Sequence, residues 1–332
     1  MENKKLCLIQ RPIGSVQQND FAIQQEPIPQ IDDGEVLIRN QFISLDPAMR
    51  GWMSELKSYV PPVPLGQVMR AYTGGVVVES KNPNFKRGEF VTGLGGVQTH
   101  FVSSGKRLLV VDTTLAPLEK YVGGLGMPGR TAYFGLLEIA KPQLGETLVV
   151  SAAAGAVGSV VGQIGKIYGC RVVGIAGGEE KCRHVVENLG FDACIDYKSP
   201  AFYRSLKGLC PNGIDIYFDN VGGFILDAVL SRMNKFGRIP VCGMISLYNA
   251  KEKPQGPQNI VSVLVNRIRM QGFIVFDYAD KYAQASNQLG QWYTDGKLRL
   301  YEDIRDGGIE VFPAVFGALF SGKKRGKLLL RV

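Results

Sequence analysis

Histidine is scarce in this chain of 332 residues, which contains only His100 and His184. A catalytic zinc ion needs three protein ligands, and two isolated histidines cannot assemble such a site. The six cysteines lie far apart and none forms a CxxC pair, so neither a disulfide framework nor a structural zinc site is indicated. We therefore expect no metal ion, and we interpret both histidines as structural.

Long apolar segments are absent as well. No run of 18 apolar residues could span a membrane, and the N-terminus lacks an apolar signal core. Lysine and arginine outnumber the acidic residues by 38 to 30, but they are scattered, with no basic run interleaved with stacking aromatics. We expect a cytoplasmic protein without membrane or nucleic-acid partners, and we assign the net charge of +8 to attraction of an anionic ligand.

Length and patterning indicate two domains, because 332 residues exceed one ordinary core. Residues 1–122 are β-rich, with turn clusters between the strands, and fit a barrel-like fold. A closing strand at 327–332 would most simply return to that domain. We predict a discontinuous domain of residues 1–122 and 300–332, and a second domain of residues 123–299. The strands predicted in the first domain cover residues 6–10, 35–43, 71–79, 89–93 and 97–102.

The second domain is organised around a strand, a tight turn and a helix. An apolar run at residues 148–150 passes through Gly155, Ala156, Val157 and Gly158 into a helical pattern. Gly155 lets the backbone bend, and Gly158 lets the helix pack closely. The N-terminus of that helix suits a pyrophosphate. The alternative is a small-residue turn in an ordinary α/β protein, because short glycine patterns recur by chance.

The segments that follow favour a dinucleotide site. Strands alternate with helical segments, which indicates a doubly wound parallel sheet. Ligands bind at the carboxyl ends of the strands in such sheets, where Gly177, Asn220 and Gly243 lie. The further predicted strands cover residues 171–176, 194–197, 214–219, 238–242 and 268–276, and the predicted helices cover residues 121–126, 129–140, 179–190, 280–294 and 312–320.

The end of the second of these strands bears on the choice of cofactor. An NAD site usually places an acidic residue about 20 residues after the glycine motif, to hold the ribose. Here that place is Gly177-Gly178, followed by Lys181 and Arg183, so a ribose phosphate would find room and positive charge. We favour NADPH. The alternative makes Glu179 the ribose ligand and Lys181 an ordinary surface lysine.

Several segments spread along the chain carry a family resemblance. They are Ser44–Pro47, Leu125–Tyr133, Ala152–Gln163, Glu179–Lys181, Asp219–Gly223 and Cys242–Asn249. Together they resemble the leukotriene dehydrogenase and oxo-prostaglandin reductase group of the medium-chain dehydrogenase/reductase superfamily. The resemblance implies an α/β fold with a chaperonin-10-like β-barrel domain plus a Rossmann doubly wound parallel sheet. It also implies NADPH-dependent reduction of the carbon–carbon double bond of α,β-unsaturated ketones and aldehydes, by a homodimer.

A reductase of this kind must polarise its substrate without zinc. Zinc-dependent members of the superfamily carry a ligand segment whose place here is Arg70–Gly75, which has no metal ligand. Hydride addition to the β-carbon of an enone builds negative charge on the carbonyl oxygen, and a hydrogen-bond donor there lowers the barrier. A tyrosine hydroxyl suits this role. The resemblance points to Tyr248 as the catalytic donor, with Tyr59 as the second candidate.

The resemblance also implies contacts with the cofactor. The 2′-phosphate would meet Lys181 and Tyr197, the nicotinamide half would lie near Asn220, and the diphosphate and ribose near Thr131 and Tyr133. The remaining residues that we expect to bind the cofactor are Gly155, Ala156, Val157, Gly158, Gly177, Cys242, Gly243 and Phe276.

Two departures from the family pattern and two rival functions stay open. Ala48 stands where relatives often carry tyrosine, and Lys324 stands where they carry asparagine before the Gly-Lys pair. Quinone reduction would use the same cofactor without a metal. A non-catalytic NADPH-binding module would bind the cofactor without turnover, although the retained Tyr248 segment argues against it.

Overall fold

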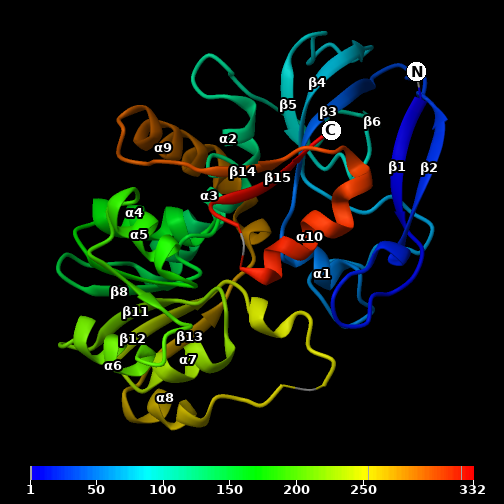
Figure 1. The fold of residues 1–332 in the computed structure, drawn as a ribbon. Coiled ribbons are helices and arrows are strands. Elements are labelled where there is room, and N and C mark those ends of the chain that lie inside the picture. Colours follow the sequence, from blue (N-terminus) through cyan, green and yellow to red (C-terminus); the bar gives the residue numbers. More distant parts are fainter. Residues whose placement is uncertain (1, 253, 323) are drawn as a thin grey trace. The chain divides into compact units, whose positions relative to one another are not determined.

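The computed structural model describes residues 2–252, 254–322 and 324–332. The chain forms two compact units, one made of Met1–Gly123 and Glu302–Val332 and the other of Gly124–Tyr301 (Figure 1).

The first unit is built on a mainly antiparallel sheet of seven strands. Its members are β3 (Val36–Ser44), β4 (Thr73–Ser80), β5 (Phe90–Gly93), β6 (His100–Ser103), β7 (Leu109–Val110), β14 (Glu302–Arg305) and β15 (Lys327–Arg331). The strand order is β14-β15-β3-β4-β5-β7, and β6 also pairs with β3. Because β15 lies antiparallel to β3, this late strand belongs to the same sheet as strands of the N-terminal segment.

A smaller sheet and three helices complete this unit. They are β1 (Glu2–Leu8) with β2 (Phe21–Pro27), and α1 (Ala48–Trp52), α2 (Leu118–Val122) and α10 (Phe312–Ser321). The fully buried rings of Phe312 and Phe316 stack in the core, with centroids 5.5 Å apart. Lys327 is buried at the start of β15, and its ammonium group lies 2.6 Å from an Asp46 carboxylate oxygen. That ion pair ties β15 to the loop after β3.

The second unit contains a six-stranded parallel sheet. Its strands are β8 (Thr147–Ser151), β9 (Arg171–Ala176), β10 (Ala193–Asp196), β11 (Ile214–Phe218), β12 (Met233–Val241) and β13 (Arg269–Gly272). The spatial order is β10-β9-β8-β11-β12-β13, and every neighbouring pair is parallel. This is the strand order of a doubly wound dinucleotide-binding sheet. The predicted fold class is therefore confirmed.

Helices cover both faces of this sheet. Along the chain they are α3 (Met127–Phe134), a π-helical continuation η2 (Gly135–Ala140), α4 (Gly158–Ile167), α5 (Glu179–Glu187), α6 (Phe202–Leu209), α7 (Gly223–Leu230), α8 (Val261–Val265) and α9 (Tyr282–Thr294). Figure 1 shows α4 and α5 on one side of the strands and α6 and α7 on the other. Successive strand residues alternate between the two sides: Leu148 lies against Gly165 of α4, whereas Val149 belongs to the core cluster that contains Phe202 of α6.

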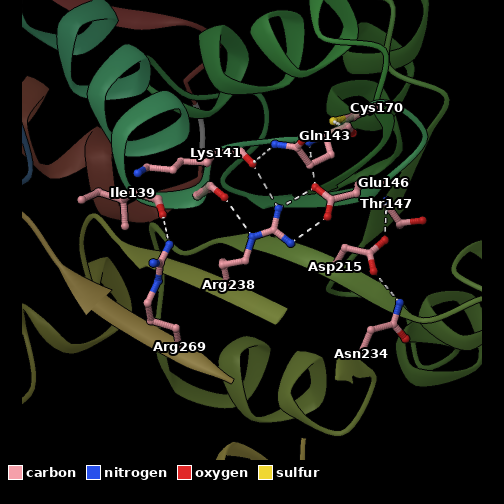
Figure 2. Close-up of polar contacts among 11 residues, drawn as sticks. Ile139, Lys141, Gln143, Glu146, Thr147, Cys170, Asp215, Asn234, Arg238 and Arg269 are labelled. Carbon is pink, nitrogen blue, oxygen red and sulfur yellow. Dashed lines mark hydrogen bonds and ion pairs between the residues drawn. The ribbon is translucent and has the colours of Figure 1, made fainter. Parts of the chain in front are cut away.

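Polar contacts fasten the end of η2 to the amino ends of the strands (Figure 2). The Arg238 guanidinium donates to Ala140 O at 2.9 Å and forms a two-pronged ion pair with Glu146, at 2.7 and 2.5 Å. Arg269 donates to Ile139 O. The last carbonyl groups of a helix have no partner within the helix, so these arginines satisfy groups that would otherwise be buried without hydrogen bonds.

The sixth strand corrects a prediction. We expected a strand over residues 268–276 and a helix from residue 280, but β13 ends at Gly272, residues Val275–Lys281 form the 3₁₀ helix η5, and α9 starts at Tyr282. The cause is Phe273, whose ring leaves the sheet and packs on Phe218 with centroids 6.2 Å apart. Phe276 consequently lies on η5 rather than at a strand end, and 42% of it is exposed.

Other boundaries moved by a few residues, and some elements had no clear pattern. The helix expected at residues 121–126 is α2, which starts and ends earlier, and β10 ends one residue before Tyr197. The sequence analysis gave no ranges for β2, β7, β14, α1, α6, α7 or α8. None of these elements spans more than eight residues, which leaves little length for a two-residue or 3.6-residue apolar period to emerge.

Candidate functional site

The turn after β8 forms the entrance of helix α4. Ala152 adopts a left-handed backbone with φ of +50°, and the Gly155 N–H donates to its carbonyl at 2.8 Å. A Cβ atom on Gly158 would stand 2.4 Å from that carbonyl oxygen, so only glycine fits there. Ala156 and Val157 are half-buried just before the helix. The first N–H groups of α4, with the positive end of its dipole, suit a phosphate.

The ends of β9 and β10 meet at the next part of the site. A Cβ atom on Gly177 would lie 2.9 Å from the Tyr197 hydroxyl oxygen, so this tyrosine lies against the glycine. The Gly178 N–H donates to an Asp196 carboxylate oxygen at 2.8 Å. Lys181 follows in the first turn of α5 and is half-buried. Gly177 and Tyr197 are thus in contact, and Lys181 follows four residues after Gly177 in the first turn of α5.

The alternative ribose ligand points elsewhere. The Glu179 side chain is 88% exposed and forms an ion pair with Arg183 at 3.3 Å on the outer surface of α5. A carboxylate that holds ribose hydroxyls must face the end of the strand. This geometry favours a cofactor with a 2′-phosphate over one without it.

At the centre of the sheet, the strand order reverses between β8 and β11, where Ser151 and Asn220 are joined. The Asn220 backbone N–H donates to Ser151 Oγ at 2.9 Å, and its side-chain amide donates to Ser151 O at 2.8 Å. In open α/β sheets the crevice at this reversal is the binding place. The structure therefore brings Asn220 to the expected position on the sheet.

The Asp219 carboxylate stabilises the same turn through hydrogen bonds to its backbone. It is fully buried, and one carboxylate oxygen accepts hydrogen bonds from the Tyr217 hydroxyl at 2.8 Å and from the N–H groups of Val221 and Gly222 at 2.9 Å each. Within the described residues its other oxygen has no hydrogen-bond partner. Burial raises the pKa of this carboxyl group. Asp219 thus fixes the turn that carries Asn220.

Tyr248 comes to the end of β12, beside that turn. Its hydroxyl oxygen accepts a hydrogen bond from the Met244 N–H at 3.2 Å, and a Cβ atom on Gly243 would lie 3.1 Å from it. The backbone after β12 lies beside the turn after β11, because the Cys242 N–H donates to Asp219 O at 2.8 Å. Burial, followed by the charge of Asp219, raises the pKa of the Cys242 thiol to about 12, so Cys242 is a neutral group here.

Two predicted contacts lie on helix α3. The Thr131 hydroxyl donates to Met127 O at 2.9 Å. The Tyr133 ring lies 5.3 Å from Phe134 and 6.1 Å from Trp292, measured between centroids, and burial raises the pKa of its hydroxyl. Both side chains take part in the packing of α3, and nothing in these contacts assigns them to a ligand.

Tyr59, the second tyrosine candidate, belongs to the first unit. It is 49% exposed, in the segment between α1 and β4. Two arginines hold that segment: Arg70 donates to Pro61 O at 3.0 Å, and Arg11 donates to Val63 O at 2.6 Å. Both anchors lie just after Tyr59, which itself remains accessible to solvent.

Sequence reasoning overlooked the residues that support the site. The sequence patterns place Ser151 just after an apolar strand and Tyr217 and Asp219 within the next one, and they assign none of the three a supporting role. The usable signal was that these polar side chains end runs of otherwise apolar strand residues, since a buried polar group needs a partner close by.

Comparisons with known proteins show the family of this chain. Residues 4–111 match a family described as the N-terminal domain of oxidoreductase, and residues 156–291 match one described as zinc-binding dehydrogenase. The NADPH-dependent curcumin reductase of Escherichia coli is 46% identical over 99% of this chain and 97% of that protein. Prostaglandin reductase 1 of Sus scrofa is 42% identical over 96% of each chain. The chain belongs to the medium-chain dehydrogenase/reductase superfamily, in the oxo-prostaglandin reductase group.

A solved member of this group extends the match to three dimensions. The crystal structure of CurA from Vibrio vulnificus in complex with NADPH superposes with a TM-score of 0.94, at 45% identity, and covers 99% of both chains. Because so close a relative was crystallised with NADPH, and Gly158, Gly177 and Lys181 lie as described above, the residues present fit that cofactor.

Zinc, which one of the family descriptions names, finds no fitting residues. Over residues 2–252, 254–322 and 324–332, no group of three or more histidine, cysteine, aspartate or glutamate side chains could hold a metal ion. In the same part of the chain, every helix is too short or too polar to cross a membrane.

Proposed function

We propose that this protein is an NADPH-dependent ene reductase that reduces the carbon–carbon double bond of an α,β-unsaturated ketone or aldehyde. The observation that carries the proposal is the position of the Tyr248 hydroxyl, beside Gly243 at the carboxyl end of β12 and next to the turn that holds Asn220. In a sheet of this order the nicotinamide half of a dinucleotide lies on that side of the reversal. When bound, NADPH supplies a hydride to the β-carbon.

Tyr248 stabilises the charge that this addition produces. Negative charge develops on the substrate carbonyl oxygen, and a preorganised hydrogen-bond donor lowers the barrier. The Met244 N–H, which donates to the tyrosine oxygen at 3.2 Å, holds that oxygen in place. A tyrosine hydroxyl is neutral at pH 7 and keeps a proton to donate. Tyr59 is the second candidate for this role.

The carboxyl ends of the strands would hold the cofactor. The N-terminus of α4 at Gly155–Gly158 would bind the pyrophosphate, and Lys181 and Tyr197 beside Gly177 would bind the 2′-phosphate. Asn220, Cys242 and Gly243 would border the nicotinamide half. The further contacts proposed from the family resemblance are Thr131, Tyr133 and Phe276.

The test combines substrates, cofactors and one substitution. Purified protein is assayed with NADPH or NADH against an acyclic enone, an enal, a quinone and a ketone, and the product is identified. We expect fast NADPH oxidation with the enone and a saturated carbonyl product. Y248F should lower kcat by about 10- to 1,000-fold, whereas Y203F, at a tyrosine 61% exposed on α6, should not change it.

Each contrary result identifies another function. Activity confined to the quinone would replace ene reduction by quinone reduction. Tight NADPH binding without turnover on any acceptor would leave a binding module. An unchanged kcat for Y248F would remove Tyr248 from the mechanism and direct the same test to Tyr59.

We also propose a homodimer formed through β13. This strand ends the six-stranded sheet, so one of its edges pairs with no strand of the described chain. Helix α8, which precedes it, carries exposed apolar side chains. They are Ile260 just before the helix, and Val261, Leu264 and Val265 within it.

A further inference from the structure

Two cysteines of the second unit, Cys182 on α5 and Cys194 on β10, lie on surfaces of these elements that face each other. In the parallel register, Cys194 of β10 lies beside Gly174 of β9. Its neighbour Ile195 belongs to the core cluster that contains Phe202 of α6. Successive strand residues point to opposite faces, so the Cys194 side chain points to the face covered by α5.

Two contacts place Cys182 over that position. Val185 of α5 lies 2.9 Å from where a Cβ atom on Gly174 would stand, level with Cys194. The Gly178 N–H reaches Asp196, two residues beyond Cys194, at 2.8 Å. Cys182 lies between these two contacts and three residues before Val185, on the same side of the helix. The Cys182 and Cys194 side chains therefore face each other between α5 and β10.

This pair differs from the other thiols of the chain. All six cysteines fall in the described residues and all are free. The hydrogen bond from Cys194 lowers the pKa of Cys182, and an Ala176 backbone hydrogen bond adds to it, against burial and the charge of Asp196. Burial raises the pKa of Cys170 and of Cys210 to about 11. Since the thiolate is the reactive form, the lowered pKa favours Cys182 as the attacking thiol, and Cys194 faces it across the helix–strand contact.

We propose that Cys182 and Cys194 are a dithiol that a low-molecular-weight disulfide, such as oxidised glutathione, converts into an intramolecular disulfide. The Cys182 thiolate attacks one sulfur of the glutathione disulfide, forms a mixed disulfide and expels a glutathione thiolate. The Cys194 thiol then gives its proton to that thiolate, attacks the Cys182 sulfur and expels the second glutathione. Two protein thiols are oxidised, and one glutathione disulfide is reduced to two glutathiones.

A Cys182–Cys194 disulfide would displace the adjacent residues that are proposed to bind the cofactor, a consequence that rests on the proposed function. A disulfide fixes its two sulfur atoms at about 2.05 Å from each other and so draws the start of α5 toward β10. Lys181 precedes Cys182, and Gly177 already lies within contact of Tyr197. Oxidation should therefore raise the KM for NADPH about tenfold through the loss of a charge-assisted contact, with a smaller effect on the KM for NADH.

The experiment uses the full chain and follows the thiols by peptide mass mapping without reduction. Wild type is incubated with oxidised glutathione, and we expect a peptide pair joined through Cys182 and Cys194. C194S lacks the second sulfur, so Cys182 should retain bound glutathione. C182S should leave Cys194 unmodified. C210A is the control and should behave as wild type, because Cys210 is a buried cysteine just after the end of α6.

The outcomes separate the two proposals. Stable glutathione on Cys182 of wild type, or no reaction at either cysteine, would overturn the dithiol. A mapped disulfide with an unchanged KM for NADPH would keep the modification site and remove its effect on the cofactor. The mapping needs no turnover, so it gives the same answer if the reductase assay fails with every acceptor.

Discussion

At the scale of single residues, Ser151 holds Asn220 at the point where the strand order reverses, through hydrogen bonds to its hydroxyl and its carbonyl oxygen. Its Oγ accepts from the Asn220 N–H at 2.9 Å. S151A removes that acceptor and leaves a half-buried N–H without it, which costs about 1–3 kcal/mol of unfolding free energy. We expect weaker NADPH binding as well, measured by fluorescence titration beside a urea unfolding curve.

A matched serine provides the control for this substitution. Ser231 is exposed and its hydroxyl donates to Ala228 O at 2.7 Å at the end of α7. S231A should stay within about 0.5 kcal/mol of wild type and bind NADPH normally. Equal effects of S151A and S231A would mean that Ser151 does not hold the turn.

Sequence patterns located many of these residues but not their partners. Gly158 and Asn220 follow strands, and parallel strands end at the same edge, so their positions on the sheet could be predicted. The bond between Ser151 and Asn220 spans 69 residues, and no local period encodes such a pairing. The roles of Tyr248 and Lys181 stay predictions from the family resemblance.

At the scale of elements, the close approach of α4 to the turn depends on Gly158. A Cβ atom there would lie 2.4 Å from Ala152 O and 3.1 Å from Ala153 Cα, which are backbone atoms that cannot simply rotate away. G158A should destabilise the protein by about 1–3 kcal/mol through overpacking and weaken NADPH binding. Thermal unfolding and cofactor titration measure the two effects.

Gly208 of α6 offers the matched control. A Cβ atom on this helical glycine meets nothing within 4 Å, and alanine favours a helix over glycine by about 0.5–1 kcal/mol. G208A should raise the melting temperature and leave cofactor affinity unchanged. A stable G158A with normal NADPH affinity would contradict the role assigned to the turn.

The arginine contacts in Figure 2 should affect the stability of the protein and not its catalytic activity. Arg238 joins Ala140 O to Glu146, at the amino ends of the strands, whereas the candidate site lies at their carboxyl ends. R238A leaves a charged group and helix-end carbonyls without their partner, at a cost of about 2–3 kcal/mol. We expect earlier urea unfolding with kcat within twofold of wild type. A large fall in kcat at full stability would contradict this separation.

The strand predicted over residues 268–276 was too long, because β13 ends at Gly272. Phe273, Ile274 and Val275 are residues that favour strands, so the sequence alone extends the strand to Phe276. The ring packing of Phe273 against Phe218 is a tertiary contact, and it overrides the local preference.

At the scale of the whole molecule, the exposed edge of β13 predicts an assembly. We expect sedimentation equilibrium to give twice the chain mass of 36.3 kDa. If β13 forms the interface, the amides of Arg269–Gly272 should exchange slowly with deuterium at high protein concentration and faster on dilution. A monomer would rule out the homodimer, and a dimer with fast exchange at these amides would move the interface elsewhere.

The pairing of β15 with β3 has a consequence for biosynthesis. On the ribosome, β3 emerges early, but its neighbour Leu330, which pairs with Ile43, is added 287 positions later. All of Gly124–Tyr301 is translated in between, so the second unit can fold while the first still lacks a central strand. Leu328, Leu329 and Leu330 are fully buried in the finished sheet. The nascent first unit therefore exposes an apolar edge until translation reaches β15, and this interval is when it most needs a chaperone.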